Sequence, residues 1–246
     1  MKKYFYIVIF TLLAACGQTN NKTNKNNATA NSGNDTLKSQ TSNESIDTSP
    51  KNSDEKNHLT IPENYSELKE SPSNGRKMER ILADLDDDKL TDTALIVENT
   101  ADFANYLLLV YLSGQDETFQ MRFFNENEMN MYPVQLAVKK NVLEVGYFLD
   151  GTAGFGRFLK LRFDETKKKM KLIGYDTGYK KGGAGSERLD KSFNLLTGDY
   201  VVKLQKLVPK IATETFKGNK KIESIYMEDI GIETLLKLDE IGSEFE

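Results

Sequence analysis

The sequence predicts an all-β protein built from antiparallel sheets. Short strand-like runs recur from residue 93 to residue 207, and turn residues separate them. No segment between residues 90 and 205 keeps the 3.6-residue period of an amphipathic helix. Strands that follow one another through short turns pair antiparallel. We therefore expect one propeller-blade-like or sandwich-like domain over residues 59–246, with a short helix near the C-terminus.

The first predicted strands are apolar and short. Residues 93–99 and 106–114 are rich in Leu, Ile and Val, and Gly114 ends the second run. Residues 117–124 follow with a loose alternation of polar and apolar side chains. The three runs predict three successive strands.

Two hairpins follow from their turn residues. Residues 133–148 are interrupted by Lys139-Lys140-Asn141, where Asn141 suits a positive φ. Residues 192–207 are interrupted by Thr197-Gly198-Asp199, and glycine is the usual residue at a left-handed turn position. Each segment therefore predicts two strands and a tight turn.

A third hairpin and a C-terminal helix are less regular. Residues 156–176 indicate two strands, but the apolar residues of the first strand do not alternate strictly, which leaves the register open. Residues 224–241 carry the helical pattern, interrupted by Gly231. The residues expected to share the apolar face of this helix are Ile225, Ile232, Leu235 and Leu236.

The N-terminus has the three parts of a secretory signal over residues 1–15. Two lysines precede the apolar run Tyr4–Leu13, and two alanines follow it. This run is shorter than the roughly 20 residues needed to span a bilayer. Leu13-Ala14-Ala15-Cys16 resembles the lipobox of bacterial lipoproteins, in which the cysteine is acylated and becomes the first residue. The resemblance implies a membrane-anchored chain with lipid on Cys16; the alternative is an ordinary signal peptide.

Residues 16–58 are predicted to be a disordered tether. Residues 18–57 hold ten asparagines, and Leu37 and Ile46 are the only large apolar residues. Such a segment buries too little surface to offset the entropy lost on ordering. No acidic residue precedes Asp35. By resemblance to Gram-negative sorting rules, this implies the cell envelope, the outer rather than the inner membrane, and the periplasmic face.

Missing residue types exclude several kinds of catalysis. His58 is the only histidine and Cys16 the only cysteine, so the domain lacks catalytic triads, zinc sites of His or Cys, and thiol chemistry. A net charge of −4 with short basic clusters also argues against nucleic acid. The domain is therefore expected to be non-enzymatic. The alternative is a carboxylate-dependent hydrolase acting on an extracytoplasmic polymer such as a glycan, using pairs such as Glu144 and Asp150.

The stretch from residue 84 to residue 92, DLDDDKLTD, contains five aspartates in nine positions. Calcium takes six to eight oxygen ligands from carboxylates, carbonyls and water. Carboxylates at positions 1, 3, 5 and 9, with a backbone carbonyl at position 7, would supply this mixture. The predicted ligands are Asp84, Asp86, Asp88, Leu90 (backbone carbonyl) and Asp92. The alternative is a strand-entry turn that holds no metal.

This loop resembles the D-x-D-x-D-G-x-x-D loop of FG-GAP and VCBS repeats, in which a strand follows the last aspartate. Lys89 stands where those repeats usually have glycine. A positive φ there would cost a lysine about 1 kcal/mol. Asp87 falls outside the ligand pattern and is expected to be a solvated acid or a turn residue.

A wider resemblance covers most of residues 60–205. The opening IPENYSEL, the acidic loop and the late segment SFNLLTGDY look like a group of Bacteroidetes lipoproteins. The group implies no enzymatic activity, and its shared motifs are structural. The expected function is an envelope lipoprotein whose β-rich domain binds or organises an envelope protein or glycan. The glycine-rich segments at residues 150–157 and 179–188 are expected to be loops, because neither has the spacing of a nucleotide-binding site.

Overall fold

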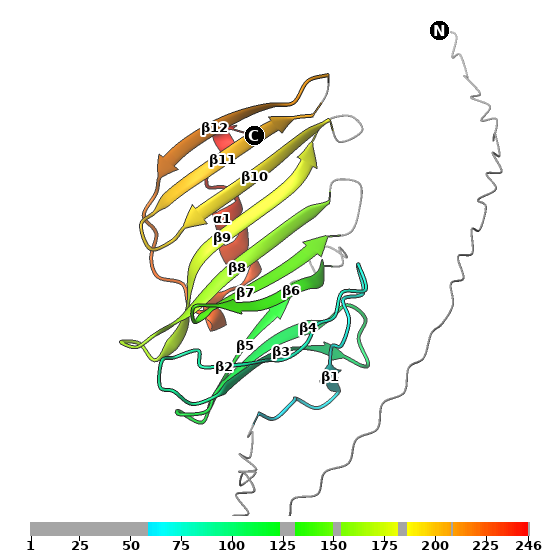
Figure 1. Ribbon diagram of the computed structural model, residues 1–246, viewed down its shortest axis with the longest axis vertical. Coiled ribbons are helices and arrows are strands. Elements are labelled where there is room, and N and C mark those ends of the chain that lie inside the picture. The colour runs from blue at the N-terminus through cyan, green and yellow to red at the C-terminus, as the bar shows by residue number, and fades with distance from the viewer. Residues whose placement is uncertain (1–58, 124–130, 150–153, 182–185, 208, 246) are drawn as a thin grey trace, which may run out of the picture. The chain divides into compact units, whose positions relative to one another are not determined.

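The computed structural model describes residues 59–123, 131–149, 154–181, 186–207 and 209–245 (Figure 1). Within these ranges two antiparallel sheets of five and seven strands account for most of the chain, with one short α-helix near the C-terminus. The predicted all-β antiparallel class is confirmed, in its sandwich-like form. The predicted signal peptide and tether, including Cys16, lie outside the described residues.

The smaller sheet contains the first five strands. They are β1 (Tyr65–Glu67), β2 (Ile81–Ala83), β3 (Asp92–Asn99), β4 (Tyr106–Leu112) and β5 (Glu117–Phe123). The path runs β1-β3-β4-β5, and β2 also pairs with β3. β1 and β2 were not predicted, because a strand of three residues is too short to show a period.

Both faces of β3 and β4 are buried, which explains their continuous apolar sequences. Alternate side chains enter different clusters. Ala94 and Ile96 join the main core, whereas Leu95 and Val97 pack with Leu107 and Leu109 under residues of the segment that leads into β1.

The larger sheet is an uninterrupted antiparallel meander in chain order. It contains β6 (Met131–Lys139), β7 (Val142–Leu149), β8 (Phe155–Asp164), β9 (Lys169–Lys181), β10 (Glu187–Asn194), β11 (Asp199–Lys206) and β12 (Ala212–Asn219). The three predicted hairpins are present. Asn141 has φ +58° and Gly198 has φ +82° at their turns.

The uncertain register of the β8–β9 hairpin has a structural cause. The pairing shifts between Lys160 and Leu161, where Ile173 of β9 is an extra residue. Leu159, Leu161 and Phe163 are buried on one face, and Phe158 lies on the other. A bulge in the partner strand cannot be read from the alternation of β8 alone.

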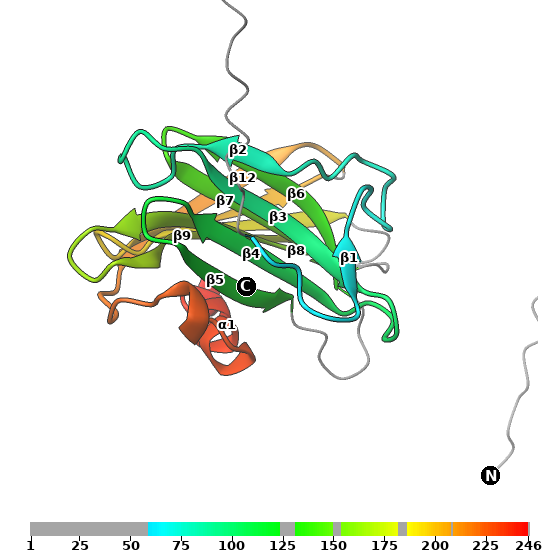
Figure 2. The same ribbon diagram turned by 90° about the horizontal axis from the view of Figure 1, so that it is seen from below.

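The two faces of the larger sheet have different surroundings. The inner face packs on the smaller sheet, and Tyr147 of β7 meets Phe123 of β5 edge-to-face at 5.3 Å between ring centroids. The same inner face carries the C-terminal segment, formed by η2 (Met227–Asp229), α1 (Ile232–Asp239) and η3 (Ser243–Phe245). Figure 2 shows the C-terminal segment on the β5 side of the smaller sheet, and its η2 turn contacts this edge strand.

The C-terminal helix is shorter than its sequence pattern. It begins after Gly231, and Leu235 and Leu238 are its buried residues. Leu236 is 48% exposed, so the expectation that it shares the apolar face is wrong. Ile225 lies before the helix and does not help to define its buried face. Leu235 and Leu238, three residues apart, face the sheet together. No helix among the described residues is long and apolar enough to cross a membrane.

A buried polar network fastens α1 to the larger sheet. Arg157 of β8 donates from Nη2 to Asp239 Oδ2 at 2.6 Å and from Nε to the Tyr175 hydroxyl at 3.0 Å. Tyr175 donates to Asp239 Oδ1 at 2.6 Å. Burial raises the pKa of Tyr175, and the Asp239 carboxylate raises it further, so the hydroxyl remains a donor.

Residues 53–246 form one compact unit. Every residue of the main apolar core lies between Leu68 and Ile241. The fragment Ser53–Glu246 therefore carries its own core.

Candidate metal site

The acidic loop connects β2 to β3 and is folded by its own aspartates. The Lys89 amide donates to Asp84 Oδ2 at 3.0 Å, and the Leu90 amide donates to Asp88 Oδ1 at 2.7 Å. The Asp88 amide donates to Asp86 Oδ1 at 3.3 Å. Aspartate side chains commonly accept from backbone amides two residues later, which closes a tight turn.

Two non-glycine residues of this loop take a left-handed conformation. Asp87 has φ +67° and Lys89 has φ +70°. Lys89, which stands where FG-GAP-like loops usually have glycine, therefore has the backbone conformation that favours glycine, as the resemblance of the loop implied. The lysine backbone is strained at about 1 kcal/mol.

Three carboxylates converge inside the turn. Asp84, Asp86 and Asp88 each offer one oxygen, and these oxygens lie within 4.8 Å of one another. Calcium–oxygen distances are about 2.3–2.6 Å, so two ligands on opposite sides of one ion lie about 5 Å apart. The three side chains therefore have a spacing that suits a cation of this size, and the group could hold a metal ion.

Burial adds to the negative character of the group. Asp86 is only 6% exposed. Asp84 Oδ1 is buried and has no hydrogen-bond partner among the described residues. A buried carboxylate oxygen without a partner is costly, and a bound cation would remove that cost.

Asp92 has a different role from the other predicted ligands. It is fully buried and lies outside the group of three. Its Oδ2 accepts from the Leu85 amide at 2.7 Å, and its Oδ1 accepts from the Ser113 amide at 2.9 Å. Burial raises the pKa of Asp92, although these hydrogen bonds oppose the rise. Asp92 therefore joins the two ends of the acidic loop and the turn after β4.

Leu90 and Asp87 stand at the edge of the loop. Leu90 is 45% exposed, and because its side chain is a hydrocarbon, its backbone carbonyl is the one oxygen that it could offer a metal. Asp87 is exposed and accepts a hydrogen bond from the Asn141 side chain at the tip of the β6–β7 hairpin. This bond links the acidic loop to the larger sheet.

Sequence reasoning missed two residues of the β4–β5 turn, Gly114 and Gln115, that lie against the carboxylates. Gln115 donates from Nε2 to Asp86 Oδ2 at 3.0 Å. A Cβ added to Gly114 would lie 1.7 Å from Asp88 Oδ2. Gly114 is therefore needed for close approach, not only to end a strand. The glycine was visible in the sequence, but its neighbour 26 positions earlier was not.

The carboxylate pair considered for hydrolysis is not assembled by the described residues. Glu144 accepts from Gln135 Nε2 at 3.2 Å, and Asp150 lies outside the described residues.

The two glycine-rich segments are partly strand. In the first, residues 155–157 begin β8. In the second, residues 179–181 end β9 and residues 187–188 begin β10. The strands therefore extend further into both predicted loops than expected.

No protein-family model matches this chain, no curated protein matches it, and no solved structure matches it. The resemblances to lipoproteins and to FG-GAP-like loops therefore rest on the motifs quoted above.

Proposed function

We propose that this chain is a lipid-anchored envelope lipoprotein whose non-enzymatic β-rich domain binds or organises another envelope component and is stabilised by calcium. The observation that carries the proposal is the convergence of the Asp84, Asp86 and Asp88 carboxylates in the β2–β3 loop. The LAAC sequence ending at Cys16 supports the anchor. Two or three acyl chains on that residue would hold the protein stably at a membrane.

Calcium suits the loop better than magnesium. Calcium accepts irregular shells of carboxylates, carbonyls and water, whereas magnesium requires near-ideal octahedral geometry. Asp84, Asp86 and Asp88 alternate along a tight turn, and a separation of up to 4.8 Å between their oxygens admits calcium. Binding only to the folded state would stabilise it. A cation at this position would join β2, β3 and the β4–β5 turn.

Thermal unfolding of Ser53–Glu246 tests the calcium site. At a calcium concentration ten times the dissociation constant, we expect a gain of about 1.4 kcal/mol over the protein in EDTA. This gain corresponds to a rise of several degrees in Tm. Extracellular calcium modules commonly bind at about 0.1–1 mM, so the titration should reach 10 mM.

Asp86→Asn should abolish the calcium-dependent rise. Asp87→Asn is the matched control, because it removes the same charge from the same loop but lies outside the carboxylate group. If calcium raises the Tm of Asp86→Asn and of Asp87→Asn by equal amounts, or does not raise the Tm of the unaltered domain, the loop is a strand-entry turn that holds no metal.

The anchor is tested separately on the full chain, where Cys16→Ser should move the protein from the membrane fraction to the soluble fraction.

A further inference from the structure

The outer face of the larger sheet contains a groove that the proposed calcium site does not use. Its volume is about 970 Å³, near the upper end of the range for small-molecule sites. Residues from β7 to β12 line it. Phe148, Phe158 and Val201, which lie in it, belong to neither apolar cluster of the described residues. The groove is therefore separate from the core.

The strand register arranges the groove in rows. One row crosses from β8 to β12 in the order Phe158, Asp176, Ser192, Val201 and Lys217. The neighbouring row is Gly156, Gly178, Asp190, Lys203 and Thr215. Side chains in these rows point to the same face.

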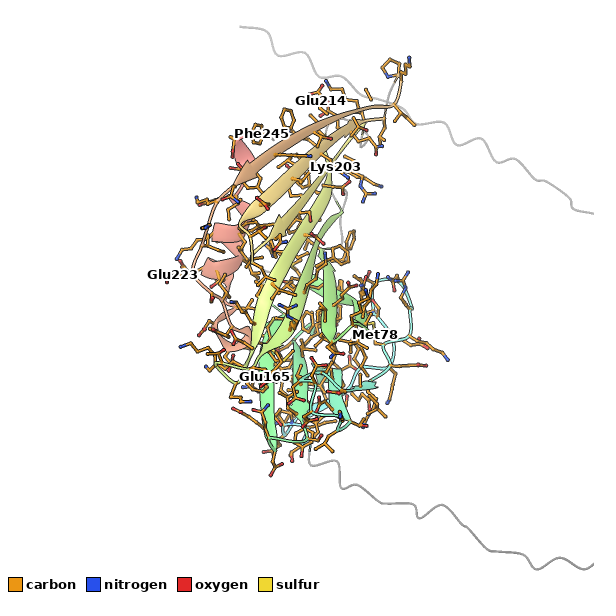
Figure 3. The ribbon with its side chains drawn as sticks, turned by 60° about the vertical axis from the view of Figure 1, so that its left-hand side comes forward. Met78, Glu165, Lys203, Glu214, Glu223 and Phe245 are labelled. Atoms are coloured by element: carbon orange, nitrogen blue, oxygen red, sulfur yellow. The ribbon has the colours of Figure 1, made fainter. Side chains whose placement is uncertain are left out.

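The small residues form the floor between two unlike walls. Gly156, Gly178 and Ser192 form this floor in the middle of the sheet, where the Phe148 and Phe158 rings lie over Gly156 and the Asp190 carboxylate lies over Gly178. Phe148 and Phe158, both half-buried, form an apolar wall over β7 and β8. Lys203 and Lys217, both exposed, form the opposite wall over β11 and β12. Figure 3 shows Lys203 and Phe245 on opposite sides of the sheet, with Phe245 on the side of the C-terminal helix.

The charge of the groove is positive in a chain whose net charge is negative. Its two acids already have cationic partners, since Asp176 accepts from Lys160 Nζ at 2.7 Å and Asp190 accepts from Arg188 Nε at 3.0 Å. Lys180, also in the groove, and the two lysines of the wall have no ion pair among the described residues. Unpaired ammonium groups beside an apolar wall match a ligand with an anionic end and an apolar body.

We propose that this groove, defined by Phe148, Phe158, Ser192, Lys203 and Lys217, binds a long-chain carboxylate. The apolar chain lies against the two phenylalanines and the carboxylate meets the lysines. Strands are about 4.8 Å apart, so the walls on β8 and β11 are separated by about 14 Å, which requires an extended ligand. This inference rests on the binding role proposed above, but not on the calcium site.

Isothermal titration calorimetry on Ser53–Glu246 in EDTA tests the inference. Dodecanoate, kept below its micelle concentration, should bind at least tenfold more tightly than dodecyltrimethylammonium, which has the same chain and the opposite charge. Acetate, which has the headgroup alone, should give no measurable heat. Equal binding of the two amphiphiles, or no binding of dodecanoate, would overturn the proposal.

Variants locate the binding to the groove. Lys203→Met/Lys217→Met should weaken dodecanoate binding by roughly tenfold. Lys77→Met/Lys167→Met changes the net charge equally at exposed positions outside the groove and should have no effect. Ser192→Trp should fill the floor and abolish binding, while its unchanged Tm shows that the fold is intact. Loss of binding in the control pair, or full binding with Trp at position 192, would contradict the assignment.

Because these titrations contain EDTA, a failed calcium experiment leaves them interpretable. Calcium stabilisation without dodecanoate binding would reject the groove ligand alone. Dodecanoate binding without calcium stabilisation would reject the calcium site alone.

Discussion

Aspartates that are close neighbours in the sequence have different physical roles in this protein. Asp92 is buried among backbone amides, which satisfy both of its oxygens. Asp84 has one buried oxygen without a partner among the described residues. Asp87 is exposed and bonded to Asn141. The composition of the loop gives the number of carboxylates, but the backbone turn decides which of them converge.

Gly114→Ala should weaken calcium binding without unfolding the domain. The added methyl would overlap Asp88 Oδ2, which lies 1.7 Å from the Cβ position, so the flexible carboxylate must move away. Losing the position of one ligand should reduce calcium affinity by roughly tenfold or more. The calcium dependence of Tm measures this change. Gly231→Ala is the control, because no atom lies within 4 Å of its added Cβ, and a similar loss there would refute the explanation.

Glu67 should make stability depend on pH below the usual pKa of a glutamate. The hydrogen bond from Arg80 lowers the pKa of Glu67, and Lys69 at 2.8 Å lowers it further. Stabilisation from a lowered carboxyl pKa is present above the unfolded value of 4.5 and is lost as pH falls through the folded value. Because Arg80 is 42% exposed, the contribution should be at most about 1 kcal/mol.

The measurement is Tm between pH 6 and pH 3 for the unaltered domain and for Glu67→Gln. The variant should be less stable at pH 6, and the difference should shrink as the pH falls below 4.5. Glu79→Gln, at an exposed position with a 4.0 Å contact to Lys77, should follow the unaltered domain throughout. A difference that stays constant with pH would show that Glu67 acts through packing and not through its charge.

At the scale of elements, the hairpins could be predicted from the sequence, and the edge strand β12 of the larger sheet could not. Asn141 and Gly198 mark two turns because the residue type itself suits a positive φ. β12 was not predicted, since most of its residues are exposed and it is held by backbone pairing with β11. The closeness of Gly114 to Asp88 also depends on the packing of two turns, which no local pattern contains.

Asp239→Ala should release the C-terminal helix from the larger sheet. The substitution leaves Arg157, whose side chain is 8% exposed, without its carboxylate, and breaking a buried pair from one side costs about 3–5 kcal/mol. Because Asp239 is 22% exposed, we expect the lower end, about 3 kcal/mol. Thermal unfolding measures the loss, and limited proteolysis should cut first between residues 220 and 231.

Asp229→Ala is the matched control, because this aspartate is exposed in η2 and forms no ion pair with any other described residue. A double-mutant cycle with Arg157→Met gives a second test. The double variant should be more stable than the sum of the two single losses predicts, because neither charge is then left unpaired. Strict additivity would mean that the pair contributes little to helix docking.

At the scale of the whole molecule, the smaller sheet and the C-terminal segment cover the inner face of the larger sheet, and the groove occupies the outer face. The acidic loop lies near the hairpin tips, since Asp87 meets Asn141. The groove residues Gly156 and Gly178 lie at the opposite ends of β8 and β9 from their tip. Phe158, the groove residue nearest the tips, pairs with Gly146, five positions from Asn141, so about 17 Å of strand separates the two regions.

This separation predicts that the two sites act independently. Mutations far apart without shared contacts usually have additive effects on free energy. Ser192→Trp should therefore keep the full calcium-dependent rise in Tm, and Asp86→Asn should keep its dodecanoate affinity within about twofold in EDTA. Thermal unfolding and calorimetry on the same two variants measure both quantities. If Asp86→Asn weakens dodecanoate binding while its Tm in EDTA is unchanged, a conformational link along the β8–β9 hairpin must connect the sites, since their separation excludes direct contact.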